Sequence, residues 1–124
     1  MKDWDAMAHR HSSLLVTPDG SGEESPICFE VGDGWYDLLE TLWGNLDLYL
    51  ETFPPEERIY ITCVKEKFGS LRVYTNQHDD GVQKIIDDAE AQSNYVCEVC
   101  GKPGKMYLIH SAYWHGVRCD RCVK

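Results

Sequence analysis

The runs Arg58-Ile59-Tyr60-Ile61-Thr62-Cys63-Val64 and Leu71-Arg72-Val73-Tyr74-Thr75 stand near the middle of the chain. Both are rich in β-branched and aromatic residues, which favour strands. The segment between them ends in Gly69-Ser70, and a primed two-residue turn with glycine first suits that pair. We therefore expect a β-hairpin. Its cross-strand pairs would be Phe68 with Leu71, Lys67 with Arg72 and Lys65 with Tyr74.

This hairpin would present three basic side chains, those of Lys65, Lys67 and Arg72, on one face. Like charges that lie opposite one another destabilise a sheet, so the face requires compensation. Glu66 points to the other face and cannot supply it. Three interpretations stay open: a face screened by solvent, an acidic neighbour such as the following helix, or an external anion or acidic protein. Under the last one, these three residues bind a partner.

Helical patterns flank the hairpin on both sides. In the first, Asp33 is the expected N-cap and Pro54-Pro55 the stop. In the second, Asp79 or Asp80 is the expected cap, and the helix runs to about Ser93. The apolar positions at helical spacing are Trp35, Leu38, Leu39, Leu42, Leu46, Tyr49 and Leu50, then Val82, Ile85, Ile86 and Ala89. Gly44 inside the first helix is expected to mark close packing against a neighbour.

The amino-terminal part of the chain carries weaker signals. Residues 17–26 are dense in turn-forming residues and contain no large apolar side chain. We expect a flexible loop there, and residues 1–27 to be peripheral to an acidic body that spans residues 1–96. The group His9-Arg10-His11-Ser12-Ser13 offers a base and hydroxyls. Because no nearby residue is recognisable as the third group that would orient the base, nucleophilic catalysis there is not favoured.

Two Cys-x-x-Cys pairs near the carboxyl end are the strongest chemical signal. Cys97 and Cys100 are separated from Cys119 and Cys122 by 18 residues, a spacing typical of four-thiolate zinc sites. Gly101 and Gly104 suit the tight turns that such a site needs. Residues 105–110 and 114–118 resemble two short strands. We expect a zinc ribbon over residues 97–124, with iron or redox-active thiols as alternative uses of the same cysteines.

Four cysteine ligands would complete a zinc tetrahedron and leave no position for water, so the predicted cofactor is one structural Zn2+. The other two cysteines, Cys28 and Cys63, are expected to be small buried apolar groups. The sequence therefore predicts an α+β fold, in which a helix–β-hairpin–helix body carries a C-terminal four-cysteine zinc ribbon.

Charge is unevenly divided along the 124 residues. The whole chain has 12 basic and 21 acidic side chains, a net charge of −9. Residues 1–96 have a net charge of −12 and residues 97–124 one of +3, which becomes +1 once four thiolates and one Zn2+ are counted. An acidic body opposes general attraction to nucleic acids. The ribbon has basic and aromatic residues that could contact phosphates or a partner: Tyr107, Trp114, Arg118 and Arg121. The basic residues could instead offset the negative charge of four thiolates around one Zn2+, and the aromatic ones could pack the ribbon onto the body.

Three motifs carry a resemblance to a known family. They are Gly34-Trp35-Tyr36-Asp37-Leu38-Leu39, Lys65-Glu66-Lys67-Phe68-Gly69-Ser70-Leu71-Arg72-Val73-Tyr74, and the terminal cysteine pairs. Together, over roughly residues 28–124, the chain resembles a family of small uncharacterised proteins encoded by bacteria and especially by their phages and prophages. The resemblance implies a phage-type accessory protein with a terminal zinc ribbon.

Three classes of function remain after these observations. The leading expectation is a non-enzymatic, zinc-binding interaction protein that modulates or inhibits a host or phage protein complex. The alternative is a nucleic-acid-binding module that uses the ribbon and the basic hairpin face. An enzyme is least favoured, because the sequence contains no phosphate-binding glycine loop or nucleophile elbow. With no apolar membrane span or signal peptide, we expect a cytoplasmic protein, in the host cytoplasm if phage-encoded.

Overall fold

The predicted hairpin forms the centre of the main sheet, with β4 over Ile61–Lys67 and β5 over Ser70–Thr75. The computed structural model describes residues 2–108 and 115–122. A third strand, β3 (Phe29–Glu30), runs parallel to β4 and gives the strand order β3-β4-β5. Sequence analysis did not predict β3, because two residues are too few to show a strand period.

The turn of the hairpin differs from the expected one. Lys67 pairs with Ser70, so the turn is Phe68-Gly69, with φ of 54° and 85°, and the expected Gly69-Ser70 turn was wrong. Two residues with positive φ are the signature of a type I′ turn. The observed register sets buried Val64 opposite buried Val73, whereas the expected one would have put Glu66 opposite Val73.

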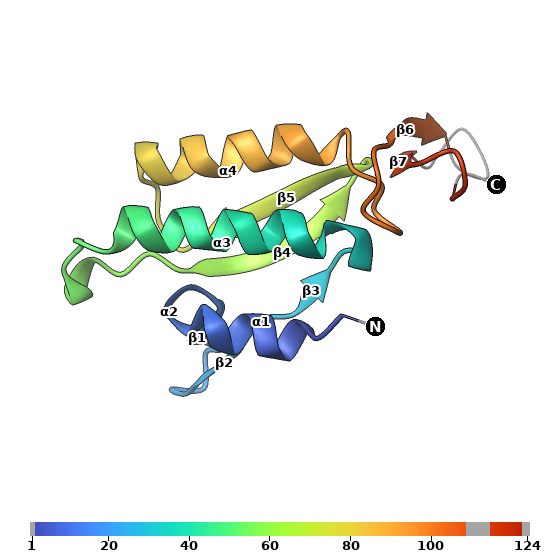
Figure 1. The fold of residues 1–124 in the computed structure, drawn as a ribbon. Coiled ribbons are helices and arrows are strands. Elements are labelled where there is room, and N and C mark those ends of the chain that lie inside the picture. Colours follow the sequence, from blue (N-terminus) through green and yellow to red (C-terminus); the bar gives the residue numbers. More distant parts are fainter. Residues whose placement is uncertain (1, 109–114, 123–124) are drawn as a thin grey trace.

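Two long helices cover one face of this sheet. α3 (Tyr36–Leu50) and α4 (Asp80–Ser93) lie side by side, with β4 and β5 behind them in the view of Figure 1. As predicted, Asp79 caps α4, and its carboxylate accepts a hydrogen bond from the Val82 amide at 3.0 Å. The core between the layers contains the predicted helix positions Trp35, Leu39, Leu42, Leu46, Val82, Ile86 and Ala89.

Asp33 does not cap α3, contrary to the expectation from the sequence. A 3-10 turn over Asp33–Trp35 precedes the helix, and a second one over Pro55–Glu57 follows it. The Asp33 carboxylate accepts a hydrogen bond from the Trp4 indole at 3.0 Å instead of capping α3. Gly44 was also misjudged, since a methyl group added there would meet nothing within 4 Å.

α4 also protects the outer edge of β5. The backbone amide of Leu71 donates to the buried Ser93 hydroxyl at 3.1 Å, and that of Val73 donates to the Glu90 carboxylate at 3.0 Å. An uncovered strand edge would present unpaired amides to other chains, and these two side chains prevent that. Burial raises the pKa of Glu90, against the Val73 hydrogen bond and the charge of Arg72. Glu90 is thus an acidic neighbour for one member of the basic hairpin face.

The amino-terminal segment belongs to the core and is not peripheral. It forms α1 (Trp4–Arg10), α2 (Ser12–Leu15) and a small antiparallel pair, β1 (Val16–Pro18) with β2 (Glu24–Pro26). Parts of the expected loop are therefore strand. Met7, Ala8, Leu14 and Leu15 are fully buried against the main body, and the Trp43 indole donates to the Met7 sulfur at 3.2 Å.

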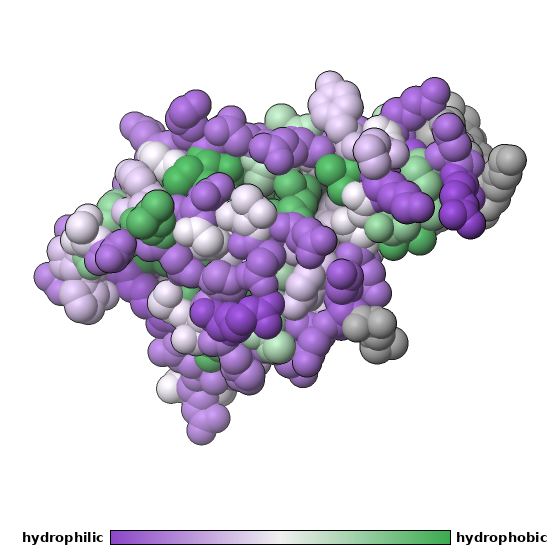
Figure 2. Space-filling view, in the orientation of Figure 1, coloured by the Kyte–Doolittle hydropathy of each residue, from purple (hydrophilic) through white to green (hydrophobic). Residues whose placement is uncertain are grey.

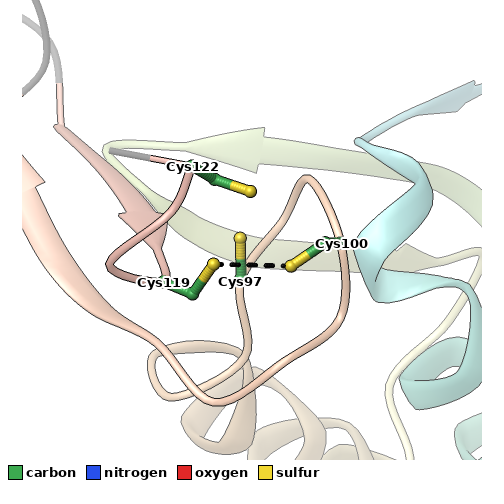
Figure 3. A group of neighbouring side chains, drawn as sticks. All are labelled: Cys97, Cys100, Cys119 and Cys122. Atoms are coloured by element: carbon green, nitrogen blue, oxygen red, sulfur yellow. Dashed lines mark hydrogen bonds between the residues drawn. The ribbon is translucent and has the colours of Figure 1, made fainter. Parts of the chain in front are cut away.

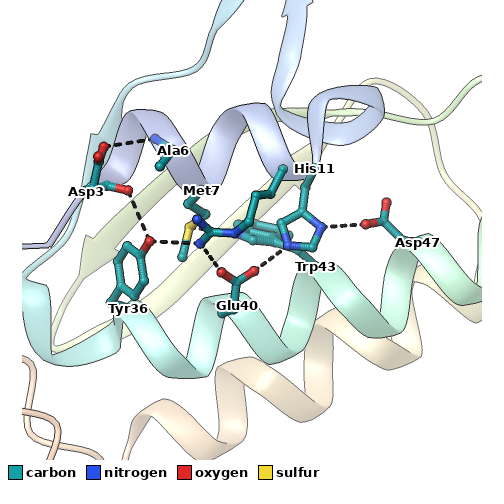
Figure 4. A network of polar contacts seen from close by, with 9 residues as sticks. Asp3, Ala6, Met7, His11, Tyr36, Glu40, Trp43 and Asp47 are labelled. Carbon is teal, nitrogen blue, oxygen red and sulfur yellow. Dashed lines mark hydrogen bonds and ion pairs between the residues drawn. The ribbon is translucent and has the colours of Figure 1, made fainter.

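A polar network fastens this segment to α3 (Figure 4). His11 lies between Glu40 and Asp47, with 2.5 Å between its Nδ1 and the Asp47 carboxylate, and Arg10 also contacts Glu40. Burial disfavours the Glu40 carboxylate, but hydrogen bonds from Arg10 and His11 outweigh that cost and lower its pKa below the ordinary 4.5. The lowered pKa means that these contacts stabilise the fold above pH 4.5, and that their contribution disappears as the pH falls through the lowered value.

Figure 2 shows hydrophilic side chains over most of the face seen in Figure 1, with apolar side chains gathered between α3 and α4. In residues 2–108 and 115–122, no helix combines the length and the apolar character that crossing a membrane requires.

The burial of the amino-terminal segment predicts a large effect of Leu14→Ala. Loss of this fully buried side chain should lower the free energy of unfolding by about 2–5 kcal/mol, because it leaves a cavity in the core. The matched control is Leu48→Ala, at a leucine that is 72% exposed, which should change it by less than about 0.5 kcal/mol. Urea denaturation measures both, and equal effects would contradict a core role for residues 1–27.

Candidate metal centre

The four cysteines of the two Cys-x-x-Cys pairs converge on one point, as Figure 3 shows. Their sulfur atoms all lie within 4.8 Å of one another, and those of Cys100 and Cys119 are 3.5 Å apart. A zinc tetrahedron with 2.3 Å bonds needs sulfur separations of about 3.8 Å. All four thiols are free of disulfides. Donor type and spacing therefore fit a tetrahedral metal ion, and four-thiolate sites hold zinc or iron.

Local backbone geometry builds each half of the site. In the first half, Gly101 has a φ of 83°, and its amide donates to the Cys97 carbonyl at 2.9 Å, which closes a tight turn. In the second, the Cys122 amide donates to the Cys119 carbonyl at 3.1 Å. The antiparallel strands β6 (Lys105–Leu108) and β7 (His115–Arg118) bring the two halves together. These strands agree with the expected ones where the structure describes them.

The sulfur environments favour thiolates unequally. A hydrogen bond from the Cys122 backbone amide is the largest effect at Cys119 and lowers its pKa to about 6. Burial opposes ionisation of Cys97, but hydrogen bonds from backbone amides, first that of Cys100, outweigh it and lower its pKa. Hydrogen bonding to Cys119 raises the pKa of Cys122 to about 12. A bound dication would favour the thiolate form of all four cysteines, so metal binding should release protons.

The first cysteine pair is held directly against the start of α3. The Gly34 amide donates to the Glu98 carbonyl at 2.8 Å, and the buried Trp35 indole donates to the Val96 carbonyl at 2.8 Å. A methyl group added at Gly34 would overlap the carbonyl oxygen of Cys97. We call these contacts between the Asp33–Trp35 turn and residues 96–98 the Gly34 seat. Through it the cysteine cluster is attached to the body.

Glu98, between the first two cysteines, completes this attachment. Its carboxylate accepts a hydrogen bond from the Gly32 amide at 3.0 Å and lies 3.5 Å from the Arg118 guanidinium. Burial raises the pKa of Glu98, while those two partners favour its ionised form. The Arg118 side chain is 12% exposed, which leaves it little surface for an external partner and favours the alternative expectation, a charge-compensating role. Arg118 compensates charge inside the protein.

The other residues assigned to partner binding lie in two places. Lys65, Lys67 and Arg72 share one sheet face, as predicted, although Lys65 now pairs with Arg72 and lies beside Glu30 of β3. Arg121 is exposed beside the cysteines, and Tyr107 belongs to β6. Trp114 lies outside the described residues.

Sequence reasoning missed Glu98 and Gly34 as parts of the site. Glu98 adds a negative charge between two cysteines that are expected to be thiolates. Such a charge needs a nearby cation when it is taken out of water, and this requirement could have pointed to Glu98 from the sequence. Nothing comparable marked Gly34. Comparisons with protein-family models, with curated proteins and with solved structures find no match to this chain.

The Gly34 seat predicts opposite outcomes for two glycine substitutions. Gly34→Ala should lower the free energy of unfolding by about 1–3 kcal/mol, because the new methyl group meets rigid backbone. Gly44→Ala, on the open face of α3, should raise it by about 1 kcal/mol, because alanine is the better helix former.

Urea denaturation of metal-loaded protein measures both changes. Chelator competition with added zinc should also show weaker binding by Gly34→Ala alone. An unchanged zinc affinity in that variant would contradict the coupling between the seat and the metal centre.

Proposed function

We propose that the protein is a non-enzymatic, zinc-stabilised interaction protein, a phage-type accessory protein that binds and modulates a host or phage protein complex in the cytoplasm. The proposal rests on the tip of the β4–β5 hairpin. Phe68 is 69% exposed there and has a φ of 54°, a conformation that is costly for a bulky residue. Unfavourable backbone conformations of this kind cluster at active sites and ligand-binding sites.

The metal ion in this proposal is one zinc ion with a structural role. Four thiolates close the coordination shell, so the zinc holds the chain together and offers no position for a substrate. It also supports the hairpin tip, because Gly69 lies against Met106 of β6 and the backbone of β7. Loss of zinc would release the strands on which the tip rests.

The partner surface would combine this apolar tip with the basic sheet face. The Lys67 ammonium lies 5.7 Å from the centre of the Phe68 ring, and Met106 beside the tip is also exposed. An exposed aromatic anchor with a basic rim suits an apolar pocket on the partner surrounded by acidic residues. We therefore assign Lys65, Lys67 and Arg72, with Phe68, to partner binding.

Nucleic-acid binding is the second candidate, and one contact favours it. Tyr74 is exposed on the same sheet face, and the Lys65 ammonium lies 5.5 Å from the centre of its ring. An aromatic ring beside a cation can stack on a base while the cation contacts phosphate. The net charge of −9 opposes nucleic-acid binding over the surface as a whole, so any such binding would be confined to this sheet face.

The proposed zinc role is tested by metal content and by two cysteine substitutions. Elemental analysis should find about one zinc per chain. Cys119→Ser should lose the zinc and lower the thermal midpoint, because three thiolates bind it far less tightly. Cys28→Ser, outside the cluster, should keep the metal. Equal zinc loss from both variants, or an equally stable metal-free protein, would contradict a structural four-cysteine site.

The proposed partner surface is tested by affinity capture from the source organism with zinc-loaded protein, followed by mass spectrometry. Phe68→Ala and the triple change of Lys65, Lys67 and Arg72 to Glu should each reduce the recovered partner at least tenfold. Leu48→Ala removes an equally exposed apolar side chain from α3 and should keep the partner. Undiminished capture by both surface variants would refute this surface.

Mobility-shift titration with DNA and RNA at two salt concentrations separates the second candidate from the first. The interaction proposal expects no salt-dependent shift. A salt-dependent shift that the triple charge reversal abolishes would favour nucleic-acid binding instead.

A further inference from the structure

Two cysteines, Cys28 and Cys63, lie outside the metal centre. Both are free thiols, and neither is buried as the sequence suggested: Cys28 is exposed and Cys63 half-buried. A small apolar role requires burial, so that expectation was wrong for Cys28. Cys63 lies in β4, and Cys28 directly precedes β3.

The register of β3 on β4 places the two cysteines next to each other. Phe29 pairs with Val64 and Glu30 with Lys65 in a parallel arrangement. Cys28 directly precedes β3, and the same register extended one residue back along both strands would set it beside Cys63. Adjacent strands lie about 4.8 Å apart. Disulfides join residues whose Cα atoms are about 4.4–6.8 Å apart, so the spacing suits a bond without movement of the backbone.

The two side chains also share one face of the sheet. Side chains alternate along a strand, so Cys28 lies on the face of Glu30, and Cys63 on the face of Lys65. Phe29 and Val64, between them, pack toward the core. Both cysteines line one surface hollow, whose other lining residues come from β1 and β2, from Asp19 and Ile27 next to them, and from Glu30 and Thr62. The pair is thus open to a small reagent.

We propose that Cys28 and Cys63 form a second thiol site, a dithiol that reacts with a low-molecular-weight disulfide such as oxidised glutathione to give a reversible intramolecular disulfide. One cysteine thiolate attacks a glutathione sulfur, which forms a mixed disulfide and releases one glutathione thiolate. The second cysteine thiolate then attacks the protein sulfur of that mixed disulfide and releases the other glutathione. The protein loses two electrons and two protons, which leave in two molecules of reduced glutathione.

The disulfide would fasten the junction between the amino-terminal segment and the sheet. Cys28 stands between β2 and β3, where that segment joins the sheet, and Cys63 belongs to the central strand β4. Their disulfide would close a loop that contains all of α3, and closing a loop restricts the unfolded chain. Oxidation should therefore raise the thermal midpoint of the protein. This inference is independent of the partner surface and of the identity of the metal ion.

The test treats full-length, zinc-loaded protein with oxidised glutathione and then determines intact mass without reductant. The wild type should lose two hydrogen atoms, keep its zinc, and give one linked pair of proteolytic peptides that contain Cys28 and Cys63. Dithiothreitol should reverse the change. Cys28→Ser and Cys63→Ser should each instead retain one glutathionyl group on the remaining cysteine, and neither should show a raised midpoint after treatment.

Two outcomes would overturn the proposal. One is wild-type protein that carries glutathionyl groups without an internal link. The other is a link that includes a cysteine of the metal centre. Zinc content and the midpoint of the untreated variants show whether each variant is folded, and Cys63→Ala replaces Cys63→Ser if the hydroxyl disturbs the half-buried position.

Discussion

The structure depends on the contact of the Asp33–Trp35 turn with the backbone of residues 96–98. The Gly34 amide donates to the carbonyl of Glu98, inside the first cysteine pair, and the Trp35 indole donates to the carbonyl of Val96, just before it. Trp35 is at the same time part of the apolar core. The contact therefore joins the hydrophobic layer to the metal centre, and it requires a residue without a side chain at position 34.

This contact changes how the metal centre relates to the rest of the chain. A short zinc ribbon has too little core to fold by itself, and the metal supplies that free energy in small zinc domains. Here the body contributes as well, through the Gly34 seat and the hydrogen bond from the Gly32 amide to the Glu98 carboxylate. β6 and β7 also contact the hairpin tip, where Gly69 lies against Met106 and the backbone of Gly116. The cysteine cluster, the hairpin tip and the core are consequently parts of one structural unit.

Charge is also distributed by the tertiary structure rather than by position along the chain. The sequence divides into an acidic body and a slightly basic tail. In the fold, Arg118 of the tail compensates Glu98, Arg72 lies near Glu90, and Lys65 lies beside Glu30. Much of the apparent basic surface is therefore balanced within the chain. At the hairpin tip, by contrast, Lys67 stays exposed and accompanies the exposed ring of Phe68.

The sequence by itself determined the features that are encoded by local patterns of residue type and spacing. Helical spacing identified α3 and α4, β-branched runs identified the hairpin, and the spacing of the two Cys-x-x-Cys pairs identified the four cysteines that cluster. Each of these patterns can be read along a single stretch of chain. Only the tertiary structure decided the rest: the turn at Phe68, the two-residue strand β3, the burial of Met7 and Leu14, and the seat at Gly34. These features depend on packing between segments distant in sequence, and no local pattern records which segments will meet.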